Sequence, residues 1–262
     1  MRRRGLLGWM LALVAALALR AAPPAAADEI RVATSGAFTA AYLELAADFE
    51  RRTGHRVTTA ATSMGVGETS IPARLARGEP LDLVIVAADA LDGLIADGHV
   101  RAGSRVDLAR SAIGMAVRRG TPKPDISTVE ALTRTLLAAP SIAYSASVSG
   151  TYLSTELFPR LGIADQLAAR SRRIEGERVG AVVARGEAAV GFQQLSELYP
   201  IEGIDVVGPL PDAVQRVTVF AAGIGRAAPA ATAAAALRDF LASADAVAVI
   251  RRSGLDPVAG SR

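Results

Sequence analysis

A glycine-rich stretch in the first third of the chain carries residues suited to holding a ligand. Residues 61–70 read ATSMGVGETS and stand between a short apolar run and a helical pattern over residues 71–77. The two glycines let the backbone approach a bound molecule closely, and the hydroxyls can donate hydrogen bonds. A helix start adds unpaired N–H donors and partial positive charge, so the stretch favours an anion. A loop of this composition can also be a plain turn.

Two more loops of this kind support the ligand-binding interpretation. Residues 35–36 follow a strand predicted over 30–34, and residues 145–151 follow a strand predicted over 141–144. In open α/β sheets the ligand crevice lies outside the carboxyl ends of the strands. Loops from two lobes could meet there around a small, oxygen-rich ligand. The candidate ligand-binding residues on the three loops are Ser35, Gly36, Ser63, Met64, Gly65, Ser147, Ser149, Gly150 and Thr151.

Strands and helices alternate along the chain, which predicts an α/β architecture. Further strands are expected at residues 56–59, 83–87, 112–118, 189–192, 204–207 and 216–222. The unbroken apolar run 83–87 is typical of a parallel strand covered on both faces. Helices are expected after caps at Thr39 and Asp89, after the capping-box spacing of residues 127–130, and over 152–161, 177–185 and 228–252.

The N-terminus predicts secretion. Residues 1–27 combine three arginines, an apolar run and a small-residue cleavage site near Ala27, which is the pattern of a signal peptide. Its removal takes away four arginines and changes the net charge from +3 to −1, so nothing points to nucleic-acid binding. The chain has no cysteine, hence no lipid anchor or disulfide. We expect a periplasmic monomer without a cofactor and without membrane insertion after signal removal.

In the order and spacing of its motifs, the chain resembles the molybdate-binding-protein-like family of periplasmic solute-binding proteins. The matching segments are residues 33–39, 49–54, 63–70, 78–89, 183–191 and 240–243. The resemblance implies the type II two-lobed fold, with lobe one from residues 28–109 and 222–262 and lobe two from residues 110–221. The ligand would bind in a cleft between lobes that close about a hinge, and an ABC permease would be the partner.

The departures from that family concern the ligand. Alignment places Ala37 where the molybdate binders have a serine, Gln194 where they have a tyrosine, and Arg178 at a third ligand-facing position. Molybdate is held there by neutral donors, whereas an arginine fork suits a planar carboxylate. We therefore expect a transport binder for a small anion, more an organic polycarboxylate than molybdate. A surface role for Arg178 stays open.

The same resemblance includes an enzyme, the bacterial aconitate isomerase, as the alternative function. Moving an allylic proton requires an acid/base group and cationic contacts for three carboxylates. Arg178 and Arg74 are candidates for those contacts, and Glu68 for the base if burial raises its pKa. Glu68 can equally be a solvated loop carboxylate. A serine hydrolase is excluded, because no Gly-x-Ser-x-Gly motif occurs.

Overall fold

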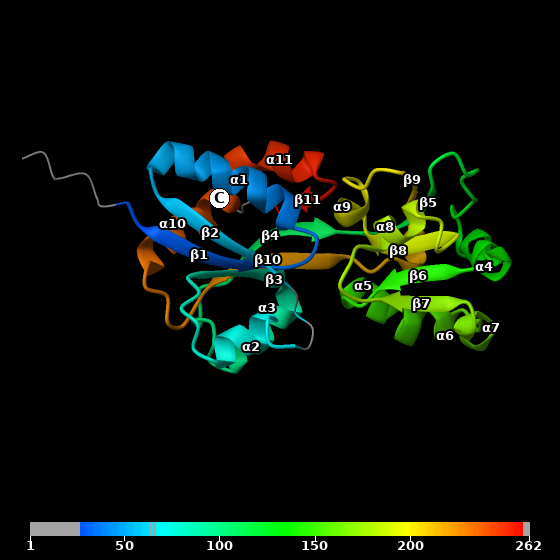
Figure 1. Ribbon diagram of the computed structural model, residues 1–262, viewed down its shortest axis with the longest axis horizontal. Coiled ribbons are helices and arrows are strands. Elements are labelled where there is room, and N and C mark those ends of the chain that lie inside the picture. Colours follow the sequence, from blue (N-terminus) through cyan, green and yellow to red (C-terminus); the bar gives the residue numbers. More distant parts are fainter. Residues whose placement is uncertain (1–26, 63, 65–66, 259–262) are drawn as a thin grey trace, which may run out of the picture.

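The computed structural model describes residues 27–258 apart from positions 63, 65 and 66. The chain forms two α/β lobes side by side, each built on its own mixed sheet with helices on both faces (Figure 1). The expected signal peptide lies outside the described residues except for Ala27. In the part of the chain that the structure describes, no helix has the length and apolar character needed to cross a membrane.

The first sheet has six strands in the spatial order β11, β4, β10, β3, β1, β2. They are β1 (Glu29–Thr34), β2 (Arg56–Ala61), β3 (Leu83–Ala87), β4 (Val106–Ser111), β10 (Thr218–Ile224) and β11 (Asp256–Pro257). β1 pairs in parallel with β2 and β3, while β10 runs antiparallel between β3 and β4. Every residue of β3 is buried, which confirms the prediction from its apolar run.

Helices cover both faces of the first sheet (Figure 1). The helices on one face are α1 (Thr39–Thr53), α10 (Ala231–Leu241) and α11 (Val247–Arg252), and those on the other are α2 (Ile71–Ala76) and α3 (Ala88–Ala96). Tyr42, Leu45 and Phe49 of α1 enter the core at the predicted helical spacing. Ile71 and Leu91 belong to the separate core on the opposite face.

The second sheet has five strands in the order β7, β6, β8, β5, β9. They are β5 (Ile113–Arg118), β6 (Ile142–Ser145), β7 (Ser171–Ile174), β8 (Val190–Gln194) and β9 (Ile204–Pro209). One face carries α4 (Val129–Ala138), α5 (Val148–Tyr152), α6 (Phe158–Arg160) and α7 (Ala164–Ala168); the other carries α8 (Val179–Ala184) and α9 (Leu195–Leu198). The first sheet therefore draws on residues 29–111 and 218–257, and the second on 113–209. The lobe boundaries expected from the sequence cut through β4 and β10, whose pairing keeps both strands in the first sheet.

Several predicted helix boundaries were wrong. The expected C-terminal helix over 228–252 is divided by a 3₁₀ turn at Ala244–Ala246. The helix expected over 152–161 begins four residues earlier, at Val148, so Ser149, Gly150 and Thr151 lie on it and not in the loop before it. Phe38 and Ala87 occupy the N-cap positions of α1 and α3 without side-chain caps, so Thr39 and Asp89 lie inside their helices instead.

The capping box before α4 was also placed one residue too early. Thr128 is the N-cap, and the Ala131 backbone N–H donates to its Oγ1 at 3.1 Å. The Ser127 hydroxyl turns away and donates to Asp125 Oδ1 at 2.7 Å. The cap therefore rests on a single hydroxyl.

We predict that Thr128→Ala lowers the free energy of unfolding by about 1 kcal/mol, because the substitution leaves a helix N–H without its acceptor. Urea denaturation measures the loss. Ser127→Ala is the matched control and should change stability by less than about 0.5 kcal/mol. A larger loss in Ser127→Ala than in Thr128→Ala would contradict this assignment of the cap.

Candidate functional site

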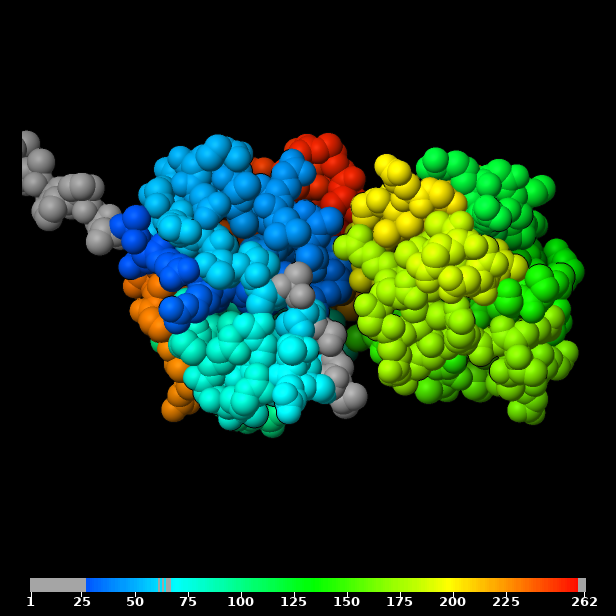
Figure 2. Space-filling model, in the orientation of Figure 1, coloured from blue at the N-terminus to red at the C-terminus, as the bar shows by residue number. Residues whose placement is uncertain are grey.

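The chain passes between the sheets twice, and these crossovers bring the loop-bearing edges of the two lobes face to face. β4 leads to β5 through Ala112, and β9 returns to β10 through residues 210–217. In the first sheet Thr218 pairs with Ser111, and in the second Ile113 pairs with Gln194. Both crossovers thus join the edges at which β1, β3, β6 and β8 end. Figure 2 shows the cleft between the lobes.

The first lobe contributes the loop after β1. The Ser35 backbone N–H donates to the Ile85 carbonyl at 3.0 Å, which fixes the loop to the end of β3. Gly36 has a φ of +80°, and a Cβ there would lie 2.7 Å from the Phe220 ring. Ala37 is buried in the core, with only 2% of its surface exposed. This loop is rigidly held, and its glycine is required by both backbone and packing.

The glycine-rich loop after β2 is described only in part. Ser63 and Gly65 lie outside the described residues, and Met64 packs half-buried against the core beneath α2 and α3. The loop does open a helix, because Ser70 is the N-cap of α2 and accepts from Ala73 N. Glu68 is exposed, so the burial on which its role as a base depends is absent in this arrangement.

Arg74, the second candidate for a carboxylate contact, is paired within its own lobe. Its Nε donates to Glu79 Oε2 at 2.7 Å, and its Nη2 bonds the other oxygen of the same carboxylate. A bidentate ion pair of this kind fixes the guanidinium in place. Contact with a ligand would require it to leave Glu79.

The second lobe gathers three serine hydroxyls where β6 meets α5. Ser145 Oγ lies 2.8 Å from Ser147 Oγ and 2.9 Å from Ser149 Oγ. A Cβ at Gly150 would lie 1.6 Å from the Ser145 carbonyl oxygen, so only glycine lets the helix approach the strand this closely. Thr151 is exposed one residue further on. The structure therefore brings together the four predicted residues Ser147, Ser149, Gly150 and Thr151.

Arg178 is the N-cap residue of α8, which packs against β6 and β8, and its side chain is exposed. Its guanidinium makes no hydrogen bond or ion pair with the other residues that the structure describes. The first N–H of α8, that of Val179, donates to Gln193 Oε1 at 2.9 Å. Gln193 thus ties the end of β8 to the start of α8 and sets the position of Arg178.

Gln194 is 2% exposed and faces the crossovers. With its amide oriented so that both atoms are satisfied, its nitrogen donates to Ser111 Oγ at 2.8 Å and its oxygen accepts from Thr218 Oγ1 at 3.1 Å. The side chain of Gln194 therefore joins the second lobe to β4 and β10, the two strands of the first sheet at which the crossovers begin and end. In this arrangement its amide is occupied by protein partners.

Glu197 is the ionisable residue of this edge that the sequence analysis missed. It lies on α9, three residues after Gln194, and its Oε2 is buried without a hydrogen-bond partner among the described residues. Burial raises the pKa of Glu197 to about 7, while the charge of Arg178 and a hydrogen bond with Gln193 oppose the shift. Its place next to Gln193 and Gln194 was the available signal, but its burial could not be foreseen from the sequence.

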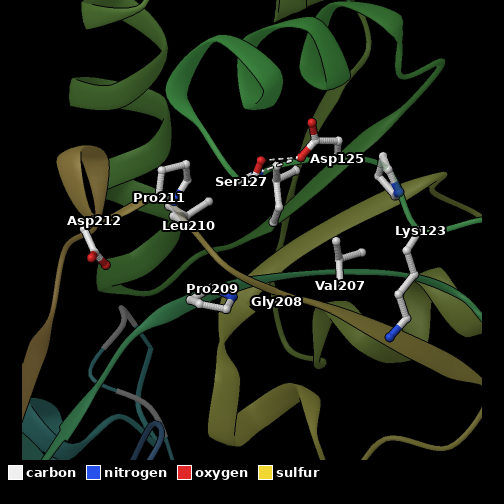
Figure 3. A pocket seen from close by; sticks show the side chains of 11 residues that line it. Lys123, Asp125, Ser127, Val207, Gly208, Pro209, Leu210, Pro211 and Asp212 are labelled. Atoms are coloured by element: carbon white, nitrogen blue, oxygen red, sulfur yellow. Dashed lines mark hydrogen bonds between the residues drawn. The ribbon is translucent and has the colours of Figure 1, made fainter.

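A separate pocket lies within the second lobe. It is lined by the loop 123–127 and by residues 207–212, with Lys123, Asp125 and Asp212 at its wall (Figure 3). Asp125 accepts from both the backbone N–H and the hydroxyl of Ser127. Since the second lobe and the start of the crossover that leaves it form this pocket, it is distinct from the space between the lobes.

Two α/β lobes joined by two crossovers, with loops and helix starts along the cleft, are the architecture of a solute-binding protein. The family model described as bacterial extracellular solute-binding protein matches residues 30–256, and the chain belongs to this family. A solved structure, the periplasmic molybdate-binding protein of Azotobacter vinelandii, superposes with a TM-score of 0.67 at 23% identity, covering 86% of this chain and 98% of that one. The predicted fold class is thereby confirmed.

Two relatives carry different names. The chain is 48% identical over 247 residues to a Pseudomonas protein named aconitate isomerase, and the match covers 94% of each chain. It is 28% identical over 240 residues to the molybdate-binding protein ModA of Azotobacter vinelandii, covering 88% of this chain and 90% of that one. Both relatives are of the kinds that the sequence analysis had named, a molybdate-binding protein and an aconitate isomerase.

We predict that Glu197 makes stability depend on pH. Below its ordinary pKa of 4.5 the carboxyl is protonated in both states; between 4.5 and about 7 it ionises only when unfolded, so folding stability falls as pH rises. Glu197→Gln removes this loss and should raise the free energy of unfolding at pH 8 by about 1–3 kcal/mol, with little change at pH 4.5.

Urea unfolding at the two pH values measures the effect. Glu202→Gln, an exposed glutamate shortly after α9, is the control and should leave the pH dependence unchanged. If Glu197→Gln were less stable than the wild type at pH 8, the carboxylate would be a stabilising group and the assignment of a raised pKa would fail.

Proposed function

We propose that this protein is an aconitate isomerase that interconverts cis- and trans-aconitate. The observation that carries the proposal is the 48% identity, over 94% of both chains, to the Pseudomonas protein of that name. Identity to the molybdate-binding relative is 28%, so the chain shares far more of its sequence with the isomerase. The sequence analysis placed the transport binder first; the higher identity to the isomerase supports placing the isomerase first here.

The chemistry of the cleft edge supports a polycarboxylate. Arg178 is exposed, has no described partner and can bind a carboxylate through two parallel hydrogen bonds. Ser147, the exposed member of the cluster with Ser145 and Ser149, offers a hydroxyl donor on the same edge. Hydroxyls alone would suit a compact oxyanion, whereas hydroxyls beside a free guanidinium suit a larger acid with several carboxylates.

The reaction requires a proton transfer and no electron transfer. A proton leaves the methylene carbon, its C–H pair becomes the new double bond, and the old double bond takes up a proton at its far carbon. The negative charge that builds up in between spreads over the substrate carboxylates. Groups that hold these carboxylates, with Arg178 the leading candidate, therefore stabilise the charged intermediate as well as the substrate. No cofactor enters this sequence of steps.

A transport binder is the second candidate, favoured by the family model and by the molybdate-binding relatives. Such a protein would close over a small anion and deliver it to an ABC permease. It would need the donors of the cleft but no proton-transfer group. Under either function we place the protein in the periplasm, with its signal peptide removed near Ala27.

We predict that the purified chain from Asp28 converts cis- to trans-aconitate, because it shares the sequence of an isomerase and carries a cationic contact at the cleft. Proton NMR follows the conversion directly. A heated sample is the control for spontaneous isomerisation, and thermal shifts with citrate, molybdate and sulfate run alongside. No conversion, together with a thermal shift from a single anion, would identify a transport binder instead.

We predict that Arg178→Ala weakens the binding of a tricarboxylate by about 1.5–3 kcal/mol, because a charged hydrogen bond is lost. Isothermal titration calorimetry with citrate gives the dissociation constant. Arg134→Ala is the matched control, since Arg134 is exposed on α4 and lies on another part of the second lobe. An unchanged constant in Arg178→Ala would remove this arginine from the site.

A further inference from the structure

We propose that Glu197 is the group that removes and returns the allylic proton. This inference rests on the proposed isomerase function and assigns its central residue. Neither the family model nor the names of the relatives points to this residue. Four observations support it: its position, its unpartnered oxygen, its charge environment and the balance of the reaction.

The position of Glu197 follows from α9. This helix begins directly after β8, at the edge of the second sheet that faces the first lobe. It already approaches that lobe, because a Cβ at Gly254, in the turn before β11, would lie 2.4 Å from Tyr199 Cδ2 and 3.5 Å from Ser196 Cα. Glu197 therefore lies on an element of the second lobe that approaches the first lobe.

Its carboxyl group lies near Gln193 and the start of α8. Gln193 accepts from Val179 N at 2.9 Å, and it acts on the carboxyl group of Glu197 by opposing the rise of its pKa. Oε2 has no partner among the described residues, although the residue as a whole is partly exposed. A buried polar atom without a partner is costly, and it is retained where a substrate or a proton completes it.

The charges around Glu197 suit a proton that must go on and come off near neutral pH. The charged group that acts on it is Arg178 from α8, and Gln193 from β8 is neutral. Desolvation outweighs Arg178 and raises the pKa of Glu197 to about 7. A base with a pKa near the working pH has an appreciable ionised fraction and still binds a proton strongly.

The step balances with this one residue. The Glu197 carboxylate takes a proton from the methylene carbon, and the C–H electron pair becomes part of an extended carbanion over the three-carbon unit and its carboxylates. The proton on Glu197 exchanges with solvent, the protonated group then delivers a proton to the far carbon, and the double bond forms between the other two carbon atoms. The carboxylate is restored at the end, and no oxidant, reductant or second substrate is used.

The test compares Glu197→Gln with Glu68→Gln and Glu202→Gln in the full mature chain. Glu68 is the alternative base, and Glu202 is the exposed control near α9. Proton NMR in D₂O reports isomerisation and deuterium incorporation at the substrate carbons. Calorimetry with tricarballylate, a tricarboxylate without a double bond, reports binding separately from turnover.

We expect Glu197→Gln to lower kcat by about 10²–10⁴-fold and deuterium incorporation in parallel, while the dissociation constant of tricarballylate changes by less than about threefold. The wild type should show a rise of kcat with pH around neutrality that Glu197→Gln lacks. Glu202→Gln should match the wild type. Thermal unfolding at pH 8 checks that the variant is folded.

Failure has two separable forms. If the wild type converts aconitate and Glu197→Gln keeps kcat within about threefold, or the loss appears in Glu68→Gln instead, the assignment of Glu197 is overturned and the isomerase function stands. If the wild type neither converts aconitate nor exchanges its methylene protons, both the function and the assignment are overturned.

Discussion

Two glutamine side chains hold the crossovers together, and the geometry of the cleft depends on them. Gln215 Oε1 accepts from Ile113 N, and its Nε2 donates to the Ile113 carbonyl, each at 2.9 Å, so one side chain imitates a strand partner for the start of β5. Gln194 bonds Ser111 and Thr218 on the other side of the passage. The chain between these two anchors is short, and any rotation of the lobes must occur there. The edges bearing the loops therefore face each other whatever the angle of opening.

Asp82 and Glu197 carry buried carboxylate oxygens with different hydrogen bonding, and the difference indicates different roles. Asp82 is 1% exposed and accepts from Arg31 N at 2.8 Å and from Ala230 N at 2.7 Å, so each oxygen has a backbone partner. It ties the start of β3 to β1 and α10. Glu197 has one unpartnered oxygen and a raised pKa. A carboxylate with a structural role needs partners for both oxygens, as Asp82 has. The unpartnered oxygen of Glu197 can instead bind a proton.

Elements with a clear apolar pattern can be predicted from the sequence. Strands that lack such a pattern, and that form because they pair with a neighbouring strand, are missed. β3 and α1 could be read directly, because burial on both faces or on one stripe leaves a clear period. β7, Ser-Arg-Arg-Ile, is an edge strand with two exposed arginines, and β4 carries Asp107 and Arg110; neither shows a strand pattern. Of the site, the loops and Arg178 follow from composition and resemblance, while the pairing of Arg74 with Glu79 and the burial of Glu197 depend on tertiary contacts that no local pattern records.

A binding cleft needs few changes to support this reaction, since the same donors serve both purposes. Contacts that hold three carboxylates in the ground state also hold the charge that spreads onto them when the methylene proton leaves, and closure of the lobes strengthens these contacts by excluding water. What a binder lacks is a base that is neither fully ionised nor fully protonated. A carboxylate on an exposed loop such as that of Glu68 stays solvated, whereas a carboxylate pressed against α8 and β8 is desolvated by the fold itself. Under the proposed function, one glutamate on α9 therefore supplies, through burial, the base that a carrier does not need.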